Sequence, residues 1–135
     1  MSVKVEISLG EFIDKMVILE IKEDRIKDAE KLQSIKKELE TLRNTWRSYN
    51  NDKTDVDQEI SQLRNINEIL WDIEDKIREK ESLQKFDDEF IELARQVYIS
   101  NDKRSNIKLK INEKLGSGLK EVKSYVNYEN EPKRK

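Results

Sequence analysis

The chain has 135 residues, of which 41% are charged and only 35% hydrophobic, and its 27 basic and 29 acidic residues nearly cancel. A typical domain is about 25% charged, so a thick core is excluded, while near-neutrality and regularly spaced apolar residues argue against disorder. The absence of cysteine and histidine excludes disulfides, thiolate sites and the commonest metal ligand. With only three Gly and one Pro, the composition indicates long amphipathic helices with charged outer faces.

Residues 3–7, Val-Lys-Val-Glu-Ile, alternate apolar and polar side chains, which predicts a short half-buried strand. One strand cannot stand alone, so its expected partner is residues 125–128 or the same strand of a second subunit. Ser8 and Glu11 form a capping box that starts a helix over residues 9–26. We expect this helix to be the most buried, because its apolar residues cover a wide arc: Leu9, Phe12, Ile13, Met16, Val17, Leu19, Ile21 and Ile26.

A bend near Asp28, with Asp28 as the N-cap, should separate this helix from the next. The following helix carries a coiled-coil-like apolar seam of Leu32, Ile35, Leu39, Leu42, Trp46 and Tyr49. Residues 50–55 contain turn formers and no apolar residue. The helix from about 56 to 83 carries a second seam of Leu63, Ile66, Leu70, Ile73 and Ile77. Two seams joined by a turn predict an antiparallel helical hairpin over about 29–83, with its turn at 50–55.

Asp87 is the expected N-cap of a last helix, which Gly116 should end. The apolar face of this helix is interrupted at Asn101, so the helix either breaks there or continues with a polar patch that faces another group. The sequence therefore predicts one all-α domain over residues 1–128, an elongated antiparallel bundle with a short N-terminal strand. A flexible charged tail over 129–135 should follow.

No apolar run approaches the roughly 20 residues that span a bilayer, and the N-terminus lacks a signal-peptide pattern. We therefore expect a protein of the bacterial or host-cell cytoplasm that has no membrane association. A net charge of -2 gives no reason to expect a nucleic-acid partner. The narrow seams leave little buried area for a stable monomer, so we predict a homodimer.

Residues 6–22, EISLGEFIDKMVILEIK, resemble the opening of a family of small bacterial and phage proteins that is catalogued as a domain of unknown function. The resemblance continues at 71–78 (WDIEDKIR), 90–98 (FIELARQVY), 101–104 (NDKR) and 121–125 (EVKSY). The sequence departs from the family at Val122, where the family more often has Glu. The resemblance implies a shared fold. It implies no activity, so no catalytic residue can be carried over.

Polar residues are interspersed among the apolar ones in the first, third and fourth expected helices. If these helices pack together, the polar groups would face one cleft, where Arg78, Arg95 and Arg104 would grip a carboxylate or phosphate. The alternative, which we favour, is a buried ion-pair network that fixes helix register. The candidate residues are Glu11, Asp14, Lys15, Glu20, Trp71, Glu74, Arg78, Arg95, Tyr98, Asn101, Asp102 and Arg104.

These patterns favour a non-catalytic protein that binds or scaffolds other proteins through helical surfaces. The alternative is a protein that binds a nucleotide or sugar nucleotide, or a magnesium-dependent nucleotide hydrolase. Glu20-x-x-Glu23 and Asp72-x-x-Asp75 resemble the carboxylate pairs that hold magnesium in all-α nucleotide pyrophosphohydrolases. The gap between these pairs is long, and Asp replaces the usual Glu. The sequence therefore assigns no catalytic residue, no metal ligand and no cofactor.

Overall fold

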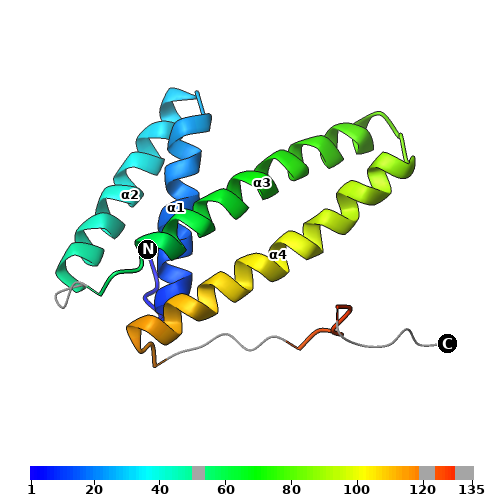
Figure 1. The fold of residues 1–135 in the computed structure, drawn as a ribbon. Coiled ribbons are helices and arrows are strands. Elements are labelled where there is room, and N and C mark those ends of the chain that lie inside the picture. Colours follow the sequence, from blue (N-terminus) through cyan, green and yellow to red (C-terminus); the bar gives the residue numbers. More distant parts are fainter. Residues whose placement is uncertain (50–53, 119–123, 130–135) are drawn as a thin grey trace.

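The computed structural model of the chain describes residues 1–49, 54–118 and 124–129, which contain four α-helices (Figure 1). The helices are α1 (Leu9–Arg25), α2 (Ala29–Tyr49), α3 (Asp57–Ser82) and α4 (Asp88–Leu115). The all-α bundle predicted from composition and periodicity is confirmed. None of these helices is long and apolar enough to cross a membrane.

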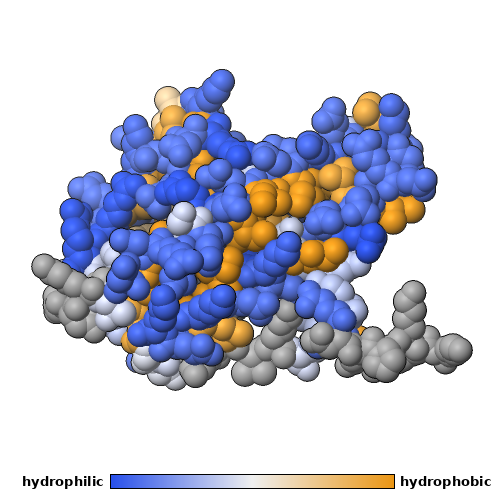
Figure 2. Space-filling view, viewed as in Figure 1, coloured by the Kyte–Doolittle hydropathy of each residue, from blue (hydrophilic) through white to orange (hydrophobic). Residues whose placement is uncertain are grey.

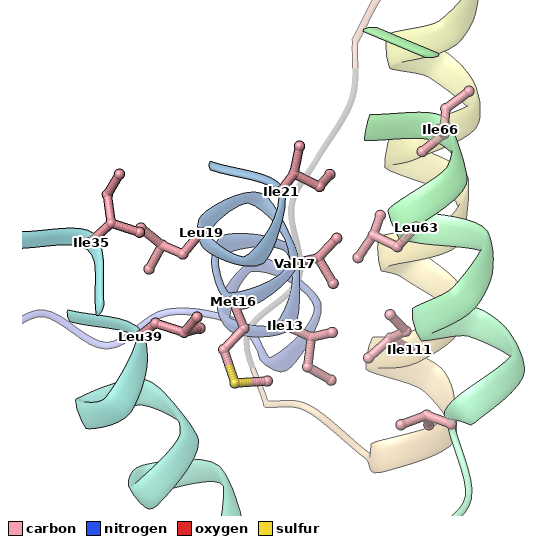
Figure 3. Packing of buried hydrophobic residues seen from close by; sticks show 11 residues of the cluster. Ile13, Met16, Val17, Leu19, Ile21, Ile35, Leu39, Leu63, Ile66 and Ile111 are labelled. Carbon is pink, nitrogen blue, oxygen red and sulfur yellow. The ribbon is translucent and has the colours of Figure 1, made fainter. Parts of the chain in front are cut away.

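Helix α1 lies between two layers of the molecule. Helix α2 packs on one side of it, while α3 and α4 pair with each other and cross the other side (Figure 3). Met16 and Leu19 of α1 point toward α2, whereas Val17 points toward α3 (Figure 3). Seven of the 17 residues of α1 are buried, against six of 26 in α3, so the expectation that this helix is the most buried is confirmed.

The predicted hairpin between residues 29–49 and 56–83 is wrong in its choice of partners. Among the described residues α2 packs on α1 alone, and α3 pairs with α4. The seams of α2 and α3 both pack against apolar surface, but not against each other. The apolar arc of α1 is wide enough to accept α2 on one side and α3 on the other. Of the predicted turn at 50–55, residues 50–53 lie outside the described part of the chain, and Thr54 and Asp55 are not helical.

The predicted strand at residues 3–7 is not formed. Val3 and Val5 are largely exposed, and residues 125–128, its expected pairing partner, lie along α4 instead. An alternating sequence becomes a strand only where a neighbouring strand supplies backbone hydrogen bonds. Residues 1–49, 54–118 and 124–129 include no such strand.

The helix boundaries follow the predicted caps. The side chains of Ser8, Asp28 and Asp87 each accept a backbone hydrogen bond at the start of α1, α2 and α4, at 3.0–3.1 Å. Helix α4 runs through Asn101 without a break and ends at Gly116, whose φ of 63° is left-handed. The polar stretch around Asn101 therefore faces a neighbour and does not end the helix.

Beyond α1, helices α3 and α4 project together as an arm, which we define as residues 74–99. No residue of the arm is buried. Three of its exposed apolar residues lie at the tip: Leu83, Phe86 and Ile91 are 58%, 54% and 54% exposed. Figure 2 shows hydrophobic surface that follows the line between α3 and α4 from the centre of the molecule into the arm. At its tip the arm is thus two helices without a third layer among the described residues.

Gly10 lets α1 approach α4 closely at the opposite end of the bundle. Its amide donates to Asn112 Oδ1 at 2.7 Å, and this contact is buried. A Cβ atom at position 10 would lie 2.5 Å from the backbone oxygen of Lys108 and 3.0 Å from Asn112 Oδ1. Only a residue without a side chain fits this crossing.

We expect Gly10→Ala to lower the free energy of unfolding by about 1–3 kcal/mol, because the clashing oxygen belongs to a helix backbone. This loss should outweigh the gain in helix propensity, which is about 1 kcal/mol. Urea unfolding followed by circular dichroism would measure it as a lower midpoint. Gly118→Ala is the control, since nothing lies within 4 Å of its added Cβ. Equal stability of the two variants would contradict the close crossing.

Candidate functional site

A series of polar contacts joins α1 to α4 along the crossing. Residue numbers rise along α1 as they fall along α4. The series contains two ion pairs and two hydrogen bonds to backbone amides of α1, which together favour one register of the two helices. From one end to the other the pairs are Leu9–Ser117, Gly10–Asn112, Glu11–Lys108 and Asp14–Arg104.

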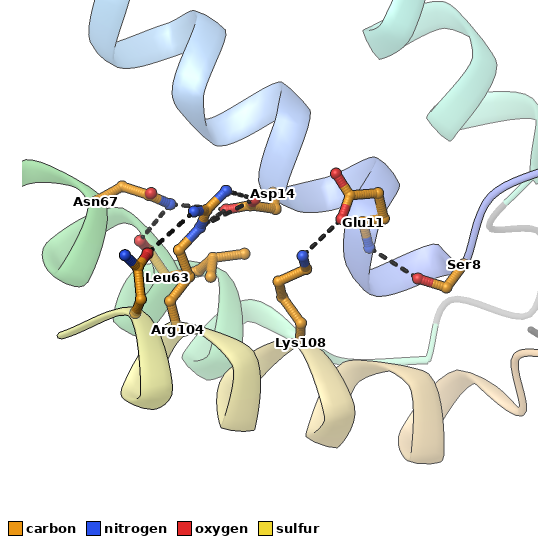
Figure 4. Close-up of polar contacts among 8 residues, drawn as sticks. Ser8, Glu11, Asp14, Leu63, Asn67, Arg104 and Lys108 are labelled. Atoms are coloured by element: carbon orange, nitrogen blue, oxygen red, sulfur yellow. Dashed lines mark hydrogen bonds and ion pairs between the residues drawn. The ribbon is translucent and has the colours of Figure 1, made fainter. Parts of the chain in front are cut away.

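Asp14 is the most buried charged side chain of this series, at 1% exposure. Arg104 Nε lies 3.1 Å from each of its carboxylate oxygens, and Arg104 Nη2 also donates to Oδ2. Asn67 of α3 donates its amide hydrogen to Oδ1 at 2.8 Å. One buried carboxylate therefore ties α1 to both α3 and α4 (Figure 4). A buried ion pair of this kind is what the sequence favoured over a ligand site, and its effect on helix register stays a prediction.

The three arginines expected to grip an anion do not act together. Arg104 is engaged with Asp14. Arg78 and Arg95 each pair with a glutamate of their own helix, at 3.0 Å and 2.9 Å, and Arg78 is 76% exposed. A three-arginine anion site is therefore not formed, and Arg104 is held by the interior of the protein.

Lys15 and Glu20 belong to other helix contacts. Lys15 Nζ lies 3.4 Å from Glu38 of α2. Glu20 pairs with Arg43 of α2 at 3.0 Å and with Arg64 of α3 at 2.9 Å. Glu20 thus bridges two helices that do not pack on each other.

One carboxylate of each pair in the hydrolase alternative, Glu20 and Asp72, is engaged by arginines. Glu20 pairs with Arg43 and Arg64, and Asp72 accepts a hydrogen bond from Arg25 at 2.6 Å. This bond, more than any other contact, raises the pKa of Arg25. Within the three described ranges, no three Asp, Glu, His or Cys side chains are grouped so as to hold a metal ion. The geometry there offers a magnesium-dependent hydrolase no ligand cluster.

Tyr98 and Asp102 face the C-terminal segment, residues 124–129. The rings of Tyr98 and Tyr128 meet edge-on with centroids 5.6 Å apart, and the Tyr128 hydroxyl hydrogen-bonds to Asp102. Partial burial, followed by this hydrogen bond, raises the pKa of Tyr128. Because this pKa is raised, the folded state favours the neutral phenol. The contact therefore stabilises the fold below the ordinary tyrosine pKa, and this stabilisation is lost as the pH rises through the raised pKa.

Trp71, Glu74, Asn101 and Arg104 do come together, in a cleft of about 480 Å³ where α1, α3 and α4 meet. We call it the three-helix cleft. It draws residues from three of the stretches that carry the family resemblance: 6–22, 71–78 and 101–104. Its apolar lining residues are Ile18, Ile21, Leu70 and Trp71, and its polar ones are Lys22, Asn67, Glu74, Asp75, Asn101 and Arg104.

Sequence reasoning missed Lys22, Asn67 and Asp75 as cleft residues. Asn67 is the clearest omission, because it is an amide directly beside seam residue Ile66 and is itself buried. A lone polar residue next to an apolar seam signals a buried hydrogen bond, and Asn67 makes one to Asp14. Lys22 and Asp75 lie inside the resembling stretches, but nothing in their spacing indicated that they line one cleft.

Residues 3–133 match the model of a family described as a family of unknown function (DUF6165). This range includes all four helices, the three-helix cleft and the arm. No curated protein and no solved structure matches the chain.

We expect Arg104→Ala to lower the free energy of unfolding by about 3–5 kcal/mol, because it leaves the buried Asp14 carboxylate without its counter-charge. Arg78→Ala removes an exposed pair within one helix and should change stability by less than about 0.5 kcal/mol. Urea unfolding of the two variants measures both effects. Similar stabilities for the two variants would show that the Asp14–Arg104 pair does not hold the helices together.

Proposed function

The chain belongs to the DUF6165 family, and we propose that it is a non-catalytic interaction protein that self-associates through the tip of the α3–α4 arm. The observation that carries this proposal is an arm of two helices whose apolar tip is covered by no described part of the chain. The proposal places the protein in the cytoplasm, where a second copy is the partner of the tip.

The chemistry of the tip suits contact with an identical tip. Phe86 and Phe90 already meet edge-on with centroids 5.2 Å apart, and they form an apolar surface between the two helices. Lys80 lies 2.8 Å from Asp87 and 3.1 Å from Glu89, so charges beside the apolar patch are paired within one chain. Asp87 raises the pKa of Lys80, whose ammonium in turn lowers the pKa of Asp87, and both stay charged near neutral pH. A twofold contact places this same patch on both copies.

We expect light scattering at micromolar concentration to give twice the 16.1 kDa mass of one chain. The double variant Phe86→Ser/Ile91→Ser should give the mass of one chain with unchanged far-ultraviolet circular dichroism, because both side chains are exposed. Val5→Ser/Tyr49→Ser is the control: it removes two exposed apolar side chains away from the arm and should remain dimeric. A monomeric wild-type chain would refute the proposal.

A further inference from the structure

We propose that the three-helix cleft binds a small amphipathic anion, a molecule with a flat apolar body and one acidic group such as a carboxylate, sulfonate or phosphate. The cleft volume of about 480 Å³ falls within the range of small-molecule sites, which is roughly 300–1,000 Å³. This inference does not depend on self-association, because the tip of the arm contributes no residue to the cleft.

The apolar half of the cleft is organised around Trp71. The guanidinium of Arg25 lies 5.6 Å from the centre of the indole ring, and the same guanidinium is hydrogen-bonded to Asp72 at 2.6 Å. These contacts hold the ring in place on its far side, since Arg25 does not line the cleft. Ile18, Ile21 and Leu70 supply the adjoining apolar surface. A flat apolar body would therefore meet a wall that is already ordered.

Lys22 brings to the cleft a cation that is not held by an ion pair. It lines the cleft from α1 and is partly buried, and its ammonium makes no ion pair with any described side chain. Of the two acidic lining residues, Glu74 pairs with Arg78 at 3.0 Å, whereas Asp75 interacts with Arg25 only electrostatically, since the hydrogen bond of Arg25 goes to Asp72.

Lys22 also lines a second, smaller pocket, which shares Ile18 and Arg104 with the three-helix cleft. The carboxylates that line this second pocket are paired with other cations. Within that pocket Glu11 pairs with Lys108, Asp14 with Arg104 and Glu38 with Lys15. The ammonium of Lys22 is therefore not committed to any described carboxylate, and it is the group of the cleft that the acidic part of a ligand would contact.

The two tryptophans of the chain allow the cleft to be observed directly. In a Trp46→Phe background, Trp71 is the sole tryptophan, and its fluorescence reports ligands that reach the cleft. We would titrate this protein with 8-anilinonaphthalene-1-sulfonate and with N-phenyl-1-naphthylamine, which has the same rings but no sulfonate. Both should quench Trp71 in a saturable manner, and the sulfonate should bind about tenfold more tightly because of its charge-assisted contact with Lys22.

Lys22→Met should weaken binding of the sulfonate about tenfold and leave the neutral probe unaffected, a pattern that a change in folding would not produce. Lys103→Met, which removes an exposed lysine of α4 outside the cleft, should leave both affinities unchanged. Phe86→Ser/Ile91→Ser should also leave them unchanged, which separates this site from the tip of the arm. The proposal is overturned by unsaturable quenching, by equal effects of the two lysine variants, or by loss of quenching in the tip variant.

Discussion

A carboxylate that is only 1% exposed has to be neutralised where it lies, and Asp14 therefore determines how the helices of this protein cross. Apolar side chains on α1 would tolerate small shifts of α3 and α4, because hydrophobic contact has no direction. The two-pronged contact of Arg104 and the amide of Asn67 have direction, and they allow one register. Gly10 makes the same crossing possible by letting the backbones meet.

The sequence was a reliable guide to local structure because the signals for it are local. Ser8, Asp28 and Asp87 cap helices where their neighbours predicted, and the wide apolar arc from Ile13 to Ile21 identified the buried helix. Pairing of elements is a long-range property. The seams of α2 and α3 have the same spacing, so periodicity could not reveal that each packs on a different side of α1, and the alternation at residues 3–7 could not supply a partner strand.

The same distinction governs the candidate site. The spacing of polar residues indicated that α1, α3 and α4 carry chemistry beyond a simple coiled coil, but it could not separate structural groups from accessible ones. Asp14 and Arg104 are 90 residues apart, and only the fold shows that each satisfies the other. Once that pair is assigned to the interior, Trp71 and Lys22 remain at the cleft and the apolar tip remains on the arm. These surfaces are where function should be sought in this family.

A double-mutant cycle on Asp14 and Arg104 tests the central claim most directly. The free energy of unfolding would be measured for the wild type, Asp14→Ala, Arg104→Ala and the double variant, with Glu74 and Arg78 as a matched exposed pair. The account predicts a coupling energy of about 2–3 kcal/mol for the buried pair and below about 0.5 kcal/mol for the exposed one. Additive effects at Asp14 and Arg104 would contradict it, because the register would then depend on apolar packing alone.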